Sequence, residues 1–145
     1  MKYRRKIIYP SIEEIKFIAH ELACELMTKT EPIPDFSTRF PNKLESCLVA
    51  PQQTFNQKDL YPTLIDKASI LLYLLIKNHP FQNGNKRVAI MSLLYFLTVN
   101  KKWLRVDTRV LYNFARWIAE SNADLKDAVV DAIKIFLTKN LEARL

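Results

Sequence analysis

Glycine is almost absent from this sequence, because its 145 residues include only Gly84. Tight β-turns usually need residues that accept positive φ, and glycine accepts it most readily. The scarcity therefore argues against a fold built mainly of β-hairpins and favours helices. The seven prolines are scattered and no Gly-rich or Ser-rich tract separates two parts of the chain. We expect one compact domain over residues 1–145.

Cysteines and long apolar runs are also scarce. Cys24 and Cys47 share no metal-ligand spacing with each other or with the two histidines, so we expect free thiols. The longest apolar stretches, residues 70–76 and 88–99, are too short to span a bilayer. The N-terminus also lacks the apolar run of a signal peptide. These absences predict a cytoplasmic protein with no membrane partner.

Positive charge is plentiful, with a net charge of +7. A basic face can bind nucleic acid by collecting phosphates. Here, however, the excess is divided between residues 1–6 and the cluster Lys101, Lys102, Arg105 and Arg109. Each cluster contains a single aromatic residue, short of the interleaved series that forms a platform for single strands. This distribution favours a basic soluble surface and argues against a nucleic-acid partner.

Helical periodicity covers most of the chain. Ser11 and Glu14 form the pattern of a capping box ahead of a helix, and Asp107 is placed to cap another. Residues 62–77 and 88–100 are apolar on almost every face, which predicts two helices in the core. Residues 42–57 are polar and suggest a short helix followed by an extended edge. The sequence therefore predicts an all-α domain with one small β-hairpin.

Two further helical patterns follow in the last third of the chain, over residues 108–121 and 124–140. Their apolar residues recur at helical spacing, so we expect one face of each helix to be buried. The residues expected to face inward are Val110, Phe114, Trp117, Ile118, Leu125, Ala128, Val129, Ala132, Ile133 and Phe136.

The loop between the two core helices contains the single glycine and breaks a local rule. The first N–H groups of a helix lack internal partners and carry the positive end of its dipole. Lys86 and Arg87 nevertheless stand in the first turn after Gly84. A bound anion such as a phosphate would remove this conflict. The loop therefore predicts a phosphate-binding site.

Residues 79–89, "HPFQNGNKRVA", resemble the signature of the Fic/Doc superfamily, His-Pro-Phe-x-Asp/Glu-Gly-Asn-Gly/Lys-Arg. The Lys at the variable position is similar to the death-on-curing (Doc) branch. The segment "LESCLVAPQQTF" is similar to the flap of this family, and the resemblance covers about residues 11–100. It implies a compact helical domain with a small β-hairpin flap.

The resemblance also implies a reaction, in which part of a nucleotide is transferred to a hydroxyl of a target protein. By this likeness His79 would be the general base, and Phe81 would anchor the loop on the core. The backbone of Gly84, Asn85 and Lys86 would bind phosphate, and Arg87 would clamp it. The cofactors implied are ATP, or another nucleoside triphosphate, and Mg²⁺. The residues implied for the target-binding flap are Leu44, Glu45, Ser46, Pro51, Gln52, Gln53 and Thr54.

Lys86 bears on which phosphate is transferred. AMP-transferring Fic enzymes have Gly at this position, whereas Lys in Doc-like members implies a reversed nucleotide that presents its γ-phosphate. The resemblance therefore favours a kinase over an AMP transferase, and both stay open. One departure is Asn83, where the family has Asp or Glu at the position that holds Mg²⁺. A third hypothesis is thus a nucleotide-binding protein that Asn83 has inactivated.

The resemblance implies a partner as well as a target. Fic proteins are often restrained by a Ser/Thr-x-x-x-Glu-Gly/Asn motif, and the nearest match here, at residues 138–143, lacks the final Gly or Asn. We therefore expect a separate antitoxin protein, as in toxin–antitoxin pairs of the Doc kind. The expected target is a cytoplasmic protein, for which the translation machinery is the hypothesis that the resemblance suggests.

Overall fold

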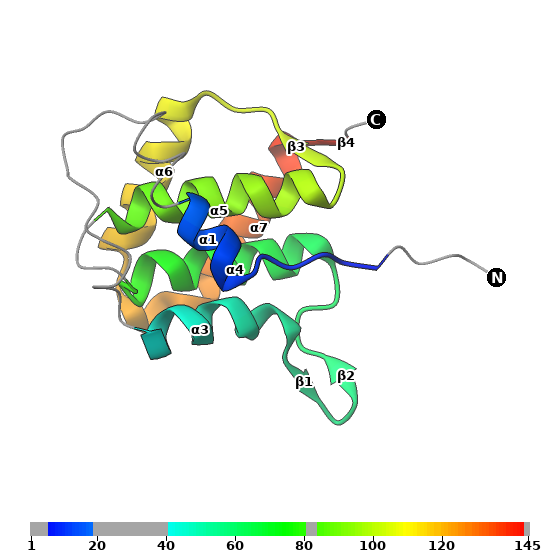
Figure 1. The fold of residues 1–145 in the computed structure, drawn as a ribbon. Helices are drawn as coiled ribbons and strands as arrows, with labels where there is room; N and C mark the ends of the chain where they lie inside the picture. The colour runs from blue at the N-terminus through cyan, green and yellow to red at the C-terminus, as the bar shows by residue number, and fades with distance from the viewer. Residues whose placement is uncertain (1–5, 19–40, 81–83, 144–145) are drawn as a thin grey trace.

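The computed structural model describes residues 6–18, 41–80 and 84–143, and the chain is mostly helical there (Figure 1). The strands form two short antiparallel pairs in this part of the chain, β1 with β2 and β3 with β4. The mostly α-helical class with a small hairpin is thereby confirmed. The helices are α1 (Ile12–Phe17), α3 (Pro41–Val49), α4 (Leu64–Lys77), α5 (Asn85–Val99), α6 (Thr108–Glu120) and α7 (Lys126–Asn140), with 3₁₀ turns η3 (Ala50–Gln52) and η4 (Ala123–Leu125). The strands are β1 (Thr54–Phe55), β2 (Lys58–Asp59), β3 (Lys102–Leu104) and β4 (Leu141–Ala143).

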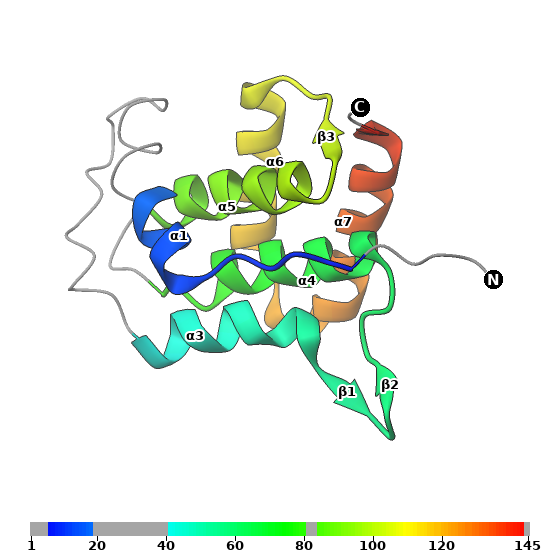
Figure 2. The same cartoon turned by 45° about the vertical axis from the view of Figure 1, so that its right-hand side comes forward.

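Helices α4 and α5 lie side by side at the centre, as their apolar sequences predict (Figures 1 and 2). Helix α3 packs against α4, and α6 and α7 also contact this central pair. The largest fully buried side chains on α4 and α5 are Ile70, Leu71, Leu72, Leu75, Ile76, Ile90, Leu93 and Phe96. Because both helices are buried along most of their length, the loop that joins them has a rigid frame on either side.

Side-chain caps fix where several helices begin. The Ser11 hydroxyl accepts a hydrogen bond from the Glu14 N–H, and the Glu14 carboxylate accepts one from the Ser11 N–H, which confirms the predicted capping box. Asp107 caps α6 by accepting from the Arg109 N–H at 2.7 Å, also as predicted. A second capping box, of Thr63 with Asp66, starts α4. Local sequence therefore determines where α4 begins.

Asp66 links this cap to α7. Burial alone would raise its pKa, but hydrogen bonds from Thr63 and the Lys134 ammonium, 3.3 Å from Oδ1, together lower the pKa of this carboxyl below its usual 3.8. A carboxylate with a lowered pKa stabilises the fold above the pKa of the unfolded chain, and this stability is lost as pH falls through the folded pKa.

We therefore expect Asp66→Asn to lower the free energy of unfolding at about pH 7, and the difference from the wild type to shrink as pH falls below about 4. Urea unfolding at stepwise lower pH measures this difference. Asp131→Asn is the matched control, because the exposed Asp131 meets the same Lys134 ammonium at 3.8 Å. A difference that stays constant with pH would contradict the role given to the Asp66 charge.

The inward faces predicted for the last two helices are partly wrong. The side chains of Val110, Trp117 and Leu125 are 48%, 47% and 56% exposed, and Ala128 is also exposed. The reason is that both helices are rotated relative to the prediction. Helix α6 buries Leu111, Ala115 and Ile118, and α7 buries Val129, Val130, Ile133 and Leu137.

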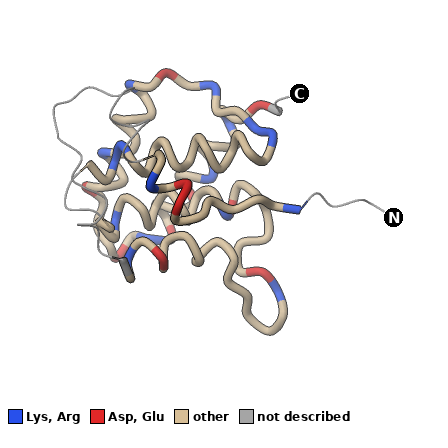
Figure 3. The backbone as a smooth tube through the Cα atoms, in the orientation of Figure 1, with Lys and Arg blue, Asp and Glu red and all other residues tan. Residues whose placement is uncertain are grey.

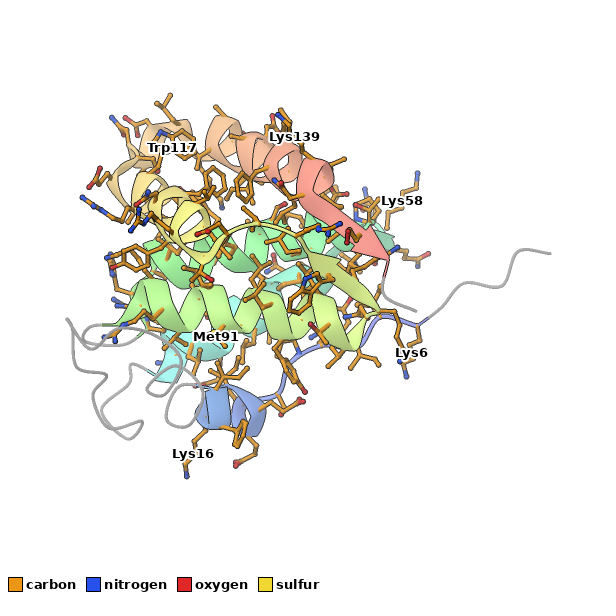
Figure 4. All side chains as sticks on the ribbon, turned by 90° about the horizontal axis from the view of Figure 1, so that it is seen from above. Lys6, Lys16, Lys58, Met91, Trp117 and Lys139 are labelled. Carbon is orange, nitrogen blue, oxygen red and sulfur yellow. The ribbon has the colours of Figure 1, made fainter. Side chains whose placement is uncertain are left out.

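The outward apolar residues of α6 still find partners. Trp117 lies at the periphery of the molecule (Figure 4) and stacks on Phe114 with ring centroids 5.6 Å apart. Phe114 in turn stacks on Phe136 of α7 at 4.2 Å. A stack of three aromatic rings therefore joins α6 to α7 at the edge of the core.

Cys47 is buried and carries a free thiol, as predicted, and burial raises the pKa of this thiol to about 11. Cys24 lies outside the described residues. The helices described here include none with the length and apolar character needed to cross a membrane.

Candidate active site

His79 stands at a strained point directly after α4. The helix ends at its C-cap, Asn78, and His79 follows with φ of 48°. The residue after a C-cap often adopts this left-handed conformation, but it is usually glycine, because a Cβ atom there costs energy. The imidazole is exposed, so burial of the ring does not explain why a histidine occupies this position. Strain of this kind at a polar residue is typical of functional sites.

The start of α5 faces the same loop. Gly84 is its N-cap, with φ of 71° and ψ of 13°, and it provides no side chain to cap the helix. No acidic residue stands in this described first turn either. A buried glycine in the left-handed region lets the chain turn tightly, and the first-turn N–H groups carry the positive end of the helix dipole. The arrangement is that of an anion-binding helix start.

The polar residues of this first turn differ in exposure. Asn85 is 8% exposed and Arg87 is 5% exposed, whereas Lys86 is intermediate. A solvated helix face therefore does not describe Arg87. A guanidinium held within the structure brings a permanent positive charge to a helix end that is already positive. The charge of Arg87 and the dipole of α5 therefore both favour an anion at the start of this helix.

Asn85 links the start of α5 to the histidine that follows α4. Its side-chain nitrogen lies 3.5 Å from Nδ1 of His79. The contact joins the histidine at the end of α4 to the first residue of α5, so the imidazole sits beside the anion-binding turn. The predicted association of His79 with Gly84, Asn85, Lys86 and Arg87 in one loop is thus present in the fold. Phe81 and Asn83, predicted to anchor the loop and to bind metal, lie outside the described residues.

A β-hairpin projects from the helical body near the start of α4 (Figures 1 and 2). Thr54 pairs with Asp59 and Phe55 with Lys58, and the N–H of Leu60 donates to the carbonyl of Gln53 at 3.0 Å. The two turn residues both have positive φ, 51° at Asn56 and 65° at Gln57. Both values are those of a type I′ turn, whose twist suits a two-residue hairpin.

The hairpin carries charges of both signs on β2 and leaves its backbone edges exposed (Figure 3). With two strands only, neither outer edge is paired within the hairpin itself. Such an edge can accept an added strand from another protein. We call residues 53–60 the flap hairpin.

The predicted flap boundaries do not match this hairpin. Leu44, Glu45 and Ser46 lie in α3, where Leu44 is fully buried, and Pro51 and Gln52 belong to η3. Only Gln53 and Thr54 of the predicted set lie in the flap hairpin. The prediction placed the flap too early because helix α3 continues to Val49 and brings Leu44 into the core. It missed Lys58 and Asp59, for which the pair Asn56 and Gln57 was the local signal.

Lys67 is a further residue that the sequence did not single out. It lies on α4 and is only 3% exposed. Its ammonium donates to the carbonyls of Pro51 at 3.3 Å and Tyr61 at 2.5 Å, and lies 3.9 Å from the Asp59 carboxylate. These groups stand on both sides of the flap hairpin, so a single buried cation fastens both of its ends to the central helix. Only the fold brings these groups together, since 16 residues separate Lys67 from Pro51.

Glu142, the glutamate of the partial inhibitory motif at residues 138–143, pairs with an arginine outside the candidate active site. Glu142 accepts a hydrogen bond from Arg105 Nη1 at 2.9 Å, on the strand pair β3 and β4. This contact ties the chain after α7 to the segment between α5 and α6. It gives Glu142 a structural partner other than Arg87.

The site thus combines a strained histidine, an uncapped helix that begins at a glycine, and an arginine in the first turn of that helix, an arrangement suited to an anion. The sequence profile of the Fic/DOC family matches residues 9–97, which is more than half of the chain. The protein therefore belongs to the Fic/DOC family.

A curated relative adds a narrower likeness. The chain is 41% identical over 64 residues to the protein named Toxin Doc from Mycolicibacterium smegmatis (strain ATCC 700084 / mc(2)155). The aligned part covers 44% of this chain and 49% of the relative, so the chain matches about half the length of that protein. No solved structure matches the chain.

Proposed function

We propose that this protein is a Doc-like toxin that transfers the γ-phosphate of a nucleotide to a hydroxyl of a cytoplasmic target protein. The observation that carries the proposal is the start of α5, where Gly84 leaves the helix uncapped and Arg87 is held in the first turn beside His79. The family membership and the 41% identity to a protein named Toxin Doc support it. A toxin of this kind acts with an antitoxin, which we propose as the partner.

The loop would act on the nucleotide by electrostatics. The backbone N–H groups of Asn85 and Lys86 would donate to phosphate oxygens, and the planar guanidinium of Arg87 would clamp them. Phosphoryl transfer depends mainly on positioning and on stabilising the charge that spreads over the equatorial oxygens. Because these donors sit on a helix buried in the core, they need little rearrangement when the charge develops.

His79 would remove the proton from the attacking hydroxyl. To do so through Nε2, the neutral imidazole must carry its own proton on Nδ1. In the structure the Asn85 amide nitrogen is the atom 3.5 Å from Nδ1, so Asn85 would hold this tautomer only with its amide reversed, its oxygen then accepting the Nδ1–H. Asn85 would therefore position the base in addition to offering its backbone N–H to phosphate.

Lys86 supports γ-phosphate transfer over AMP transfer. Its side chain occupies the place where AMP-transferring family members have Gly, and it is partly exposed at the mouth of the first turn. A cation there favours the most highly charged end of the nucleotide, which is the triphosphate terminus. The flap hairpin would hold the target as an added strand through its exposed backbone edge.

Magnesium is the metal that the family implies, and the described residues do not form a site for it by themselves. They contain no group of three or more His, Cys, Asp or Glu that could hold a metal ion. Mg²⁺ would then take its ligands chiefly from the nucleotide phosphates, with Asn83 as a neutral oxygen donor.

Asn83→Asp should raise the affinity for Mg²⁺ and any transfer rate, because a carboxylate adds the charge that a magnesium site usually contains. Calorimetric titration of Mg²⁺ into the complex with a non-hydrolysable ATP analogue measures the first effect without relying on activity. Asn78→Asp serves as a control at the other end of the loop, where no gain is expected. If neither Mg²⁺ affinity nor rate rises in Asn83→Asp, residue 83 does not occupy the metal position.

Doubly labelled ATP tests the proposed function directly. The protein is incubated with a cell extract and ATP that carries distinguishable labels on its α- and γ-phosphates. Transfer of the γ-label to protein is the expected result. Transfer of the α-label would replace the proposal by AMP transfer, and nucleotide binding with neither label transferred would indicate a protein inactivated at Asn83.

A further inference from the structure

Two clusters of basic residues that are far apart in the sequence meet at one end of the fold. Lys6 stands shortly before Ile8, and Asn100 stands directly before Lys101. The Ile8 N–H donates to Asn100 Oδ1 at 2.9 Å, and Asn100 Nδ2 donates to the Ile8 carbonyl at 2.8 Å. Ile8 and Asn100 are 92 residues apart in the chain. The separation on which the sequence-based prediction of no nucleic-acid partner depends is therefore absent from the fold.

The N-terminal segment is held on the end of α5 by two kinds of contact. Asn100 is only 6% exposed, and its Nδ2 also donates to the carbonyl of Phe96, one turn earlier, at 2.8 Å. The ring of Tyr9 stacks on the Phe96 ring with centroids 5.9 Å apart. A buried amide and an aromatic stack thus fix the segment that carries Lys6, and Figure 4 shows Lys6 at the end of the molecule where α5 ends.

The surface around this contact carries an excess of positive charge. The residues that form it, which we call the basic junction, are Lys6, Lys101, Lys102, Trp103 and Arg105. Within the described part of the chain, neither Lys6 nor Lys102 makes an ion pair. Arg105 does pair with Glu142, but both side chains are well exposed and such a pair can exchange partners. Cations gathered in one place without matching acids repel one another and attract a polyanion.

An exposed aromatic ring lies within the basic junction. Trp103 is the middle residue of β3, and its side chain is 40% exposed. Trp103 pairs with Glu142 of β4, so a strand pair holds the indole in place. Lys102 precedes it in the sequence and Arg105 follows closely. Cations that can track a phosphate backbone, beside an aromatic face on which a base can stack, are the two components of a surface for binding single strands.

We propose that the basic junction binds single-stranded nucleic acid. The ammonium groups of Lys6, Lys101 and Lys102 contact backbone phosphates, and an unpaired base stacks on the indole of Trp103. A single strand is favoured over a duplex because the bases of a duplex stack on one another and leave no face for the indole. It is favoured over a lipid surface because the Trp103 side chain is more than half covered, which limits its insertion among lipids.

The basic junction is separate from the candidate active site. It lies where α5 ends, whereas Gly84 and Arg87 stand where α5 begins. A helix of 15 residues is about 22 Å long, so one phosphate cannot reach both places. Binding at the basic junction therefore does not depend on the proposed transfer reaction.

The fluorescence anisotropy of labelled oligouridylate and oligothymidylate, each of about 12 nucleotides, measures the charge contacts. Each phosphate contact on a single strand adds about −0.7 to the slope of log K against log salt, so we expect a slope of about −2 or steeper. Lys6→Gln and Lys102→Gln should each make this slope shallower by about 0.7. The control is Lys16→Gln with Lys126→Gln, which should leave it unchanged. Figure 4 shows Lys16 on α1, away from Lys6, and Lys126 starts α7, whose other end adjoins β4.

The two tryptophans of the chain test the stacking, because Trp103 belongs to the basic junction and Trp117 lies on α6. In Trp117→Phe, the oligonucleotide should quench the remaining Trp103 fluorescence until it saturates. In Trp103→Phe, the fluorescence of Trp117 should not change. Trp103→Leu should weaken binding about tenfold, whereas Trp103→Phe should keep most of the affinity, because phenylalanine still stacks on a base. Thermal unfolding checks each variant, and quenching of the native Trp103 decides the matter if Trp103→Leu does not fold.

Several outcomes would overturn the proposal. Inorganic polyphosphate that competes as well as the oligonucleotide at equal charge removes the basis for recognising bases. A duplex bound as tightly as the single strand, or anionic phospholipid vesicles bound in preference to it, assigns the surface to that ligand. Displacement of the oligonucleotide by a non-hydrolysable ATP analogue places it in the candidate active site. A salt dependence that Lys6→Gln leaves unchanged shows that the meeting of the two clusters has no role in binding.

Discussion

Replacing His79 by alanine should reduce phosphoryl transfer by roughly a hundredfold to ten-thousandfold, the range typical of a lost general base. The affinity for nucleotide should change little, because the proposed phosphate contacts come from the start of α5 and not from the imidazole. Transfer of γ-label from ATP measures the first effect, and binding of a fluorescent ATP analogue measures the second. Loss of binding together with loss of transfer would mean that His79 shapes the loop and is not a base.

The strained backbone of His79 provides a sharper variant, His79→Gly. Because His79 has φ of 48° directly after the C-cap of α4, glycine relieves the steric cost of a Cβ atom there. We expect His79→Gly to lose transfer as His79→Ala does, yet to unfold at a higher temperature than His79→Ala. A histidine kept for the fold alone would instead leave His79→Gly less stable than the wild type, because the contacts of the imidazole are lost, and would leave transfer intact. The comparison therefore separates a functional histidine from a structural one.

The parts of the fold that could be predicted have signals within a few residues of one another. The capping box of Ser11 and Glu14 and the Asp107 cap each depend on side chains that reach the backbone two or three residues away. The candidate site was also predictable, because the residues from His79 to Arg87 are close in sequence and form one loop between two core helices. Local chemistry and helical periodicity were enough to place them.

The features that were missed depend on contacts between distant segments. The exposed Trp117 has the same helical spacing as a core residue, and only the packing of α6 against α4 and α5 decides which of its faces is buried. The flap hairpin begins later than predicted because Leu44 is drawn into the core with α3. Lys67 looked like one polar position on an apolar helix, and its carbonyl partners could not be foreseen from its neighbours.

Lys67→Met should lower the free energy of unfolding by about 2–4 kcal/mol, because two carbonyls lose their donor in a place that water reaches poorly. Methionine keeps much of the length and apolar stem of the side chain, so the change removes chiefly the ammonium. The carbonyls of Pro51 and Tyr61 and the Asp59 carboxylate would then no longer be tied to α4. Chemical denaturation measures the stability.

Lys77→Met is the matched control for this effect. The Lys77 ammonium also donates to two carbonyls, those of Ala119 and Ser121, but its side chain is only partly buried. Water can replace the ammonium there, so the expected loss is smaller, about 1 kcal/mol. The bonds of Lys77 are made to the end of α6, so Lys77→Met should leave the flap hairpin unchanged. The two variants therefore compare the same chemistry at a buried and at a wetter position.

The consequence for function follows from where Lys67 acts. Hydrogen exchange should become faster across residues 53–60 in Lys67→Met and stay unchanged there in Lys77→Met. If the flap hairpin holds the target, KM for the target should rise in Lys67→Met while the affinity for nucleotide, set at the start of α5, stays the same. Faster exchange spread evenly over the helices would show instead that Lys67 stabilises the whole domain and has no special hold on the flap hairpin.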